Sequence, residues 1–136
     1  MQNTERSFSQ DYYSIGNRQA LDYIYSAHLG FSYGNCFKYT LRAGRKVGNS
    51  AESDLNKALN YITSSNEEFS FFKRIVMKIC NSSFFSDSIS LNDKELANIL
   101  NSIIKFDKPE KIAKMIVTYA NERGINVRQE YKHFAD

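Results

Sequence analysis

Residues that interrupt helices are rare in this chain, which has one Pro and six Gly among 136 residues. Sandwiches and barrels of short strands need many more turn residues. Apolar residues instead recur at spacings of three and four, the period of an α-helix, as in the set Ala51, Leu55, Ala58, Leu59 and Ile62. With 42% hydrophobic and 14% aromatic residues the chain also differs from disordered sequences. These features predict an all-α fold.

We expect one small bundle of about six helices with short loops, since a chain of this length forms a single domain. Apolar stripes and candidate N-caps, among them Asn17, Ser32, Asn92 and Asp107, place the helices within 17–30, 33–46, 50–62, 66–80, 92–104 and 107–124, with Pro109 in the first turn of the last helix. Residues 82–90 break the pattern as a loop or one short strand. The single helical domain therefore spans 17–124, with parts 17–64 and 66–124, between an N-terminal arm (1–16) and a C-terminal tail (125–136).

The fourth expected helix is unusually rich in apolar residues. Its stripe contains Phe69, Phe72, Ile75, Val76, Ile79 and Cys80. Together with Phe84 and Phe85 in the following loop, this is more apolar surface than six short helices need. We therefore expect a homo-oligomer.

The cysteines, the histidines and the lengths of the apolar runs indicate which metal sites, membrane segments and cellular compartment to expect. Cys36 and Cys80 lie in apolar stretches without paired spacing, and together with His28 and His133 they form no zinc pattern, so we expect buried free thiols and no metal site. No apolar run approaches the ~20 residues of a membrane span, and the N-terminus lacks the basic start and apolar centre of a signal peptide. We expect a cytoplasmic protein with no membrane partner.

Positive charges gather on one side of the second expected helix. Lys38, Arg42, Arg45 and Lys46 follow the spacing i, i+4, i+7, i+8, whereas Phe37 and Leu41 can face the core. Neighbouring like charges repel, so either an anionic ligand or the helix C-terminal dipole together with solvent offsets the repulsion. Arg42 lies in the middle of this face and is the expected central phosphate contact, whose removal should leave the ligand-free protein as stable or slightly more stable.

Several neighbours extend this candidate site. Asn35 lies one turn before Lys38, and the turn Gly48-Asn49-Ser50 leads into a helix whose first amides can hold a phosphate oxygen. Asp54 and Lys57 either face the same groove or form a surface ion pair, and Tyr13 and Tyr39 either stack on a base or belong to the core. The sequence contains no P-loop and no dinucleotide-binding glycine motif, and neither histidine has an assignable catalytic partner.

A longer pattern runs through the same region as Gly34-Asn35, Lys38-Tyr39, Arg42-Ala43-Gly44 and Asp54-Leu55. With it, residues 12–62 resemble a family of short bacteriophage proteins labelled phage nucleotide kinase-like. The resemblance implies a P-loop-free deoxynucleoside monophosphate kinase, with ATP and Mg²⁺ as cofactors if it is an enzyme, in the cytoplasm of an infected host. Tyr12 and Gln19 stand where that family has His and Glu, so the resemblance implies a nucleotide ligand more strongly than a kinase.

The expected function is therefore binding of a small nucleotide, or a ligand derived from one, through the basic helix face, whether or not the protein is an enzyme. No catalytic residue is assigned. Three alternatives remain: a non-catalytic sponge that sequesters a nucleotide immune signal as an anti-defence protein, a nucleic-acid-binding module, and a purely structural helical bundle whose basic face meets solvent. The net charge of +3 is low for a protein that coats long nucleic acid. The expected binding residues are Tyr13, Asn35, Lys38, Tyr39, Arg42, Arg45, Lys46, Asp54 and Lys57.

Overall fold

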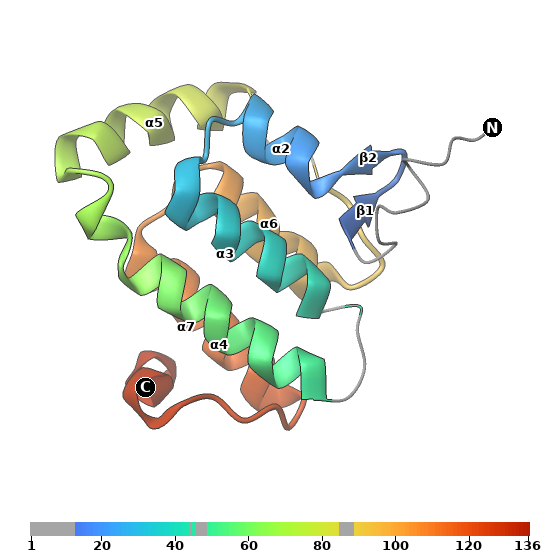
Figure 1. Ribbon diagram of the computed structural model, residues 1–136. Helices are drawn as coiled ribbons and strands as arrows, with labels where there is room; N and C mark the ends of the chain where they lie inside the picture. The colour runs from blue at the N-terminus through green and yellow to red at the C-terminus, as the bar shows by residue number, and fades with distance from the viewer. Residues whose placement is uncertain (1–12, 44, 46–48, 85–88) are drawn as a thin grey trace.

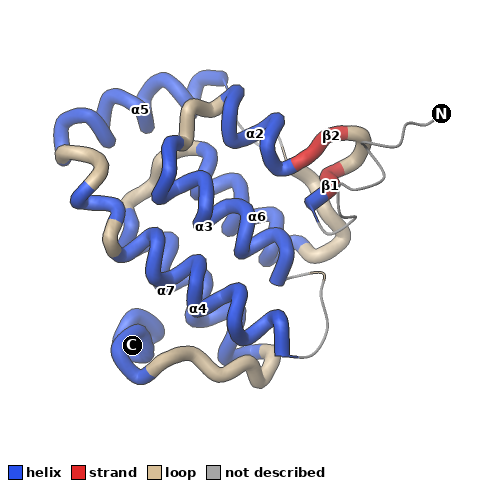
Figure 2. The backbone as a smooth tube through the Cα atoms, in the orientation of Figure 1, coloured by secondary structure: helices blue, strands red, loops and turns tan. Residues whose placement is uncertain are grey.

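The computed structural model describes residues 13–43, 45, 49–84 and 89–136, and these residues are mostly helical (Figures 1 and 2). The α-helices are α2 (Ala20–Ser26), α3 (Gly30–Ala43), α4 (Asn49–Thr63), α5 (Phe71–Phe84), α6 (Lys94–Ile104) and α7 (Pro109–Glu122). Two 3-10 helices, η2 (Ser65–Glu67) and η3 (Gln129–Ala135), and an antiparallel pair of short strands, β1 (Ser14–Ile15) and β2 (Arg18–Gln19), complete the described elements. The prediction of a small all-α bundle is confirmed.

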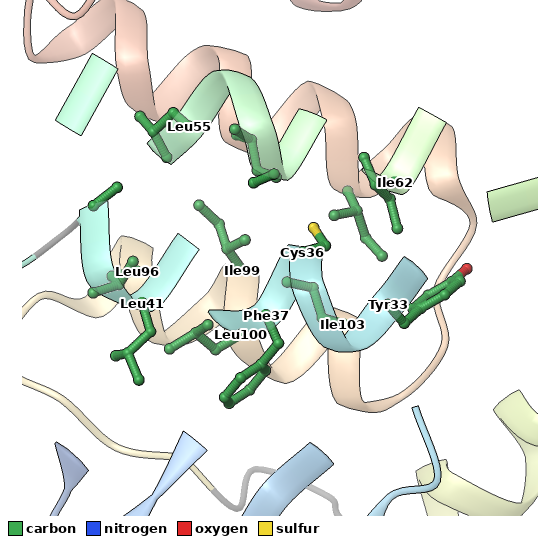
Figure 3. Packing of buried hydrophobic residues seen from close by; sticks show 14 of the residues in the cluster. Tyr33, Cys36, Phe37, Leu41, Leu55, Ile62, Leu96, Ile99, Leu100 and Ile103 are labelled. Atoms are coloured by element: carbon green, nitrogen blue, oxygen red, sulfur yellow. The ribbon is translucent and has the colours of Figure 1, made fainter. Parts of the chain in front are cut away.

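Helix α3 is the centre of the bundle. It packs against α2, α4 and α6, and α7 covers α4 and α6 (Figure 1). The predicted inward side of α3 is correct, because Phe37 and Leu41 are fully buried. Figure 3 shows the side chains that meet there, among them Tyr33, Cys36, Phe37, Leu41, Leu55, Ile62, Leu96, Ile99, Leu100 and Ile103. Burial of this apolar cluster fixes the positions of α3 and α4, which carry the candidate site.

The first helix begins later than expected. Asn17, the expected cap, lies in the turn between β1 and β2. Helix α2 starts at Ala20, where the backbone N–H of Gln19 donates to Asp22 Oδ2 at 2.7 Å in a capping box. Of the expected arm at 1–16, residues 1–12 lie outside the described part, and Ser14–Ile15 pair as a strand.

Helix α3 begins earlier than expected because its cap comes from a distant residue. Ser32 is not the cap; its N–H and that of Phe31 donate to the two carboxylate oxygens of Glu68, at 2.7 and 2.9 Å. Gly30 makes this approach possible, since its φ of +75° favours glycine and an added Cβ would lie 2.6 Å from Glu68 Oε2. A negative charge at the N-terminus also suits the helix dipole.

Helix α5 faces the opposite way from the prediction. Its apolar residues point to solvent, with Phe72 75% and Ile79 65% exposed, and of the expected stripe only Phe69, which precedes the helix, is buried. The inward side is held by polar contacts instead. Asn81 Nδ2 donates to the carbonyls of Ala27 and Ile104, both at 2.8 Å. Because these buried groups need partners, Asn81 and not the apolar stripe sets the rotation of α5.

The two cysteines differ as a consequence. Cys36 is fully buried in α3, and burial raises the pKa of its thiol to about 12. Cys80 lies on the outward side of α5 and is exposed. The prediction of two buried thiols is therefore correct for Cys36 and wrong for Cys80.

The C-terminal third follows the predicted helices with shifted caps. Helix α6 is capped by Asp93 and not Asn92, with the Leu96 N–H donating to Asp93 Oδ1 at 3.0 Å. Helix α7 begins at Pro109, which lies in the first turn as predicted. Its N-cap residue is Lys108 and not Asp107. Residues 125–136, for which we expected a polar tail, include η3, which packs on α7 and buries Tyr131. Within the described ranges, no helix has both the length and the apolar character needed to cross a bilayer.

The Glu68 cap makes the stability of the fold sensitive to acid. Burial raises the pKa of Glu68, but the hydrogen bonds from the Ser32 and Phe31 amides outweigh it, so the pKa lies below its ordinary value. A carboxyl with a lowered folded pKa stabilises the protein above its unfolded pKa, near 4.3, and this contribution is lost as pH falls through the folded pKa. We expect Glu68→Gln to lower the free energy of unfolding at pH 7 by roughly 0.5–2 kcal/mol, the range for a lost N-cap.

Urea unfolding at pH 7 and at about pH 3 measures both effects. The difference between Glu68→Gln and the parent should shrink at the lower pH. The matched control is Glu67→Gln at the exposed neighbouring position, which should change stability little at either pH. Equal losses in the two variants would contradict the cap.

Candidate functional site

Arg42 and Asp54 form a bidentate ion pair between α3 and α4, and its carboxylate is fully buried. The guanidinium donates from Nε to Asp54 Oδ2 at 2.8 Å and from NH2 to Asp54 Oδ1 at 2.5 Å. The Asp54 side chain has no exposure to solvent, whereas that of Arg42 is 22% exposed. Asp54 therefore pairs with Arg42 and not with Lys57, the partner that the i, i+3 spacing suggested.

The guanidinium of Arg42 also receives the N-terminal segment. Its NH1 donates to the Tyr13 hydroxyl at 3.1 Å. The hydrogen bond to the Asp54 carboxylate raises the pKa of Arg42 above its ordinary value, despite the opposing effect of burial. The expected central phosphate contact is thus held by two protein groups, and it presents only part of its charge to the surface.

The other cations of the expected basic face separate. Arg45 follows the end of α3 and donates to the backbone carbonyl of Ser14 in β1. Lys46 lies outside the described residues, as does Gly48 of the expected phosphate-binding turn, and α4 begins at Asn49. Arg42 and Arg45 both contact the segment around β1, so they hold protein groups as well as contributing positive charge.

Tyr39 is the point where the remaining charges gather. Lys38 Nζ lies 4.7 Å from the centre of the Tyr39 ring, the Arg42 guanidinium carbon 5.2 Å and Lys57 Nζ 5.3 Å. All three distances are within the range of cation–π contacts. The Tyr39 cluster, consisting of Tyr39, Lys38, Arg42 and Lys57, therefore brings together four of the predicted site residues from two helices.

Tyr61 continues the Tyr39 cluster along α4 and is absent from the predicted site. Its ring is stacked on that of Tyr39, with centroids 6.0 Å apart and planes 3° from parallel, and Phe31 meets its edge at 5.5 Å. Tyr61 follows Lys57 by four residues, so helical spacing alone places it one turn further on the same side. This spacing is the sequence signal that could have identified Tyr61 as a residue of the site.

The side chain of Asn35 forms a hydrogen bond within its own helix. Its side-chain amide donates to the Phe31 carbonyl at 2.9 Å, one turn earlier in α3. This local bond uses one of the two N–H donors of the side-chain amide and leaves the other N–H and the side-chain oxygen for ligand contacts. Asn35 is therefore placed near the cluster, with a smaller capacity for ligand contacts than expected.

The charge balance of the cluster favours an anion. Lys38, Arg42 and Lys57 contribute three positive charges against the single carboxylate of Asp54. None of the ion pairs recorded across the described ranges involves Lys38 or Lys57. The same ranges contain no group of three or more His, Cys, Asp or Glu side chains suited to a metal ion. The chemistry available is binding of a negatively charged group beside an aromatic surface.

Comparisons with known proteins give one match. A family model described as a protein of unknown function (DUF3310) matches residues 9–63, less than half of the chain. Neither the curated proteins nor the solved structures include a match. No nucleotide kinase family is indicated, so the assignment of residues 12–62 to the phage nucleotide kinase-like family was wrong. The matched segment ends at Thr63, the last residue of α4, and contains the whole Tyr39 cluster.

The Arg42–Asp54 pair reverses the expected effect of removing Arg42. Loss of the guanidinium leaves a buried carboxylate unpaired, so we expect Arg42→Met to lower the free energy of unfolding by roughly 3–5 kcal/mol. The double variant Arg42→Met/Asp54→Leu should recover most of this loss, because an apolar pair of similar volume often replaces a buried ion pair without cost. Chemical denaturation of the single and double variants measures both quantities.

Arg128→Met is the matched control. Arg128 pairs with Glu130 at 3.2 Å, with both side chains more than half exposed, and such surface pairs contribute about 0–1 kcal/mol. A loss in Arg42→Met no larger than in Arg128→Met would show that Asp54 does not depend on its partner.

Proposed function

We propose that the protein binds a small nucleotide, or a related ligand with a phosphate group and a flat ring, at the Tyr39 cluster. The observation that carries the proposal is the gathering of Lys38, Arg42 and Lys57 around one tyrosine ring, with a single carboxylate to balance them. A phosphate between the two lysines would relieve their repulsion and gain two charge-assisted hydrogen bonds.

The two lysines suit the phosphate because they come from different helices. Lys38 approaches the Tyr39 ring from α3 and Lys57 from α4. Arg42 lies between these helices but is held by Asp54, so its role is to add positive potential and to fix the ring, while the lysine ammonium groups make the direct contacts. Lysine ammonium groups on flexible stems can follow phosphates of different length.

The aromatic surface supports a nucleotide over a simple inorganic anion. Tyr39 and Tyr61 are both half-buried, with nearly parallel rings. A base can stack on an aromatic side chain with a gain of about 1–3 kcal/mol, and such stacking tolerates any base. The proposal therefore names the ligand class and not the base.

Titration calorimetry with adenosine, AMP, ADP, ATP and inorganic triphosphate tests the proposal, followed by the other bases. We expect affinity to rise with the number of phosphates, with triphosphate alone weaker than ATP because it cannot stack. Lys38→Ala and Lys57→Ala should each weaken ATP binding about tenfold, equal to ~1.4 kcal/mol. Tyr61→Leu should weaken ATP binding more than triphosphate binding.

Lys114→Ala is the control for loss of charge, since Lys114 is an exposed lysine of α7 outside the Tyr39 cluster. It should leave the affinity unchanged. Absence of heat with every nucleotide, or equal losses in Lys114→Ala and Lys57→Ala, would contradict the proposal. Tighter binding of single-stranded DNA with a steep salt dependence would favour the nucleic-acid-binding alternative.

A further inference from the structure

Helix α5 presents an apolar stripe to solvent between Phe72 and Ile79. Phe72, Ile75, Val76 and Ile79 follow the spacing i, i+3, i+4, i+7 and are between 40% and 75% exposed. Such a stripe normally faces a core. Because Asn81 and Lys78 hold the polar side of α5 against the bundle, the stripe has no cover within the described part of the chain. A contiguous exposed apolar surface of this kind marks a site of interaction.

A groove runs beside the stripe, between α5 and the turn from α6 to α7. Phe71, Ile75 and Phe106 supply its apolar lining, and its volume is about 280 Å³. Figure 1 shows α5 at the edge of the molecule. The α5 groove is concave and apolar, with room for a side chain that projects from a partner.

The charged residues of the α5 groove are strongly unbalanced. Arg74, Lys78, Lys108 and Lys111 stand against one carboxylate, that of Asp107. Asp107 already accepts hydrogen bonds from Lys78 and from Lys111, the latter at 3.0 Å. Helix α5 itself contains no Asp or Glu. The residues that line the α5 groove therefore carry a net positive charge, which an acidic partner can neutralise.

We propose that the apolar stripe and the α5 groove bind an amphipathic α-helix of a partner protein, whose apolar side is flanked by acidic residues. A helix fits because ridges of side chains on one helix pack into the grooves of another, and α5 has no free strand edge to pair with an extended peptide. Acidic flanks fit because complementary charges guide association and exclude other partners.

The two rival occupants fit less well. In a symmetric contact between two copies of this chain through α5, Lys73, Arg74 and Lys78 of each copy would oppose cations, and no carboxylate of α5 would offset them. A membrane surface is flat on this scale and would leave the concave groove unfilled. Both the charge and the shape of this surface therefore favour an acidic amphipathic helix as its occupant.

The first test uses synthetic peptides, because the natural partner is defined only by its chemistry. An acidic peptide of about 18 residues, long enough to form a helix, carries Leu at i, i+3, i+4, i+7 and Glu on both flanks. A second peptide has Lys in place of Glu, and a third keeps Glu but has Ser in place of Leu. By fluorescence anisotropy, the acidic apolar peptide should bind at least about tenfold more tightly than either, and added salt should weaken it.

Variants of the protein locate the contact. Phe72→Ser and Ile79→Ser should each weaken binding of the acidic peptide about tenfold without lowering the melting temperature, since both side chains are exposed. Leu21→Ser is the apolar control, at a 53% exposed position on α2. Lys108→Glu, on the rim of the groove, should weaken binding, whereas the charge control Lys114→Glu should not.

Modification of the Cys80 thiol gives an independent measure of peptide binding, and it needs no substitution in the protein. Cys80 lies one residue after Ile79 and is exposed, while Cys36 is buried with a raised pKa and reacts slowly. The acidic peptide should protect Cys80 from iodoacetamide. Equal binding of the three peptides, an unprotected Cys80, or equal losses in the control variants would overturn the proposal. So would self-association in sedimentation that Phe72→Ser abolishes, or stripe-dependent binding to phosphatidylserine vesicles in preference to the peptide.

Discussion

A carboxylate without access to water lies between the two helices that carry the candidate site. An isolated buried charge costs several kcal/mol, and Asp54 avoids this cost because both of its oxygens accept from Arg42. The pair fixes α4 against α3 at a defined register, and the Tyr13 hydroxyl adds a third segment to the same guanidinium. The positions of Lys38 and Lys57 beside Tyr39 depend on that register.

Patterns within one helix were predictable, whereas contacts between helices were not. The period of Phe37 and Leu41 correctly identified the buried side of α3. The single basic face was not found as predicted, because Arg45 follows the end of α3 and Lys46 lies outside the described residues. The Arg42–Asp54 pair was missed because its members are 12 residues apart and meet only after the chain reverses. Local spacing offered only Lys57 as a partner for Asp54, beside the alternative that both face the groove, because spacing compares neighbours on the same helix.

Helix α5 shows a second limit of sequence patterns. An amphipathic pattern identifies an apolar side, but it does not say whether this chain or another molecule covers it. Here one buried polar residue decides, because Asn81 donates to the carbonyl of Ala27, just after α2, and to that of Ile104, the last residue of α6. A single asparagine in an apolar stretch carries no periodic signal, so its role could be seen only once Ala27 and Ile104 were placed beside it.

Because Glu68 caps α3, the N-terminus of this helix is completed by a residue that comes much later in the sequence. The central helix ends at residue 43, yet the acceptor for its first amides lies 36 residues beyond Ser32. During synthesis these amides stay solvated until the chain has passed η2. The segment that matches the family model stops at residue 63, before this carboxylate. A fragment cut at that point would contain Arg42 and Asp54 but lack Glu68, so the N-terminus of α3 depends on a residue beyond the stretch that matches the family model.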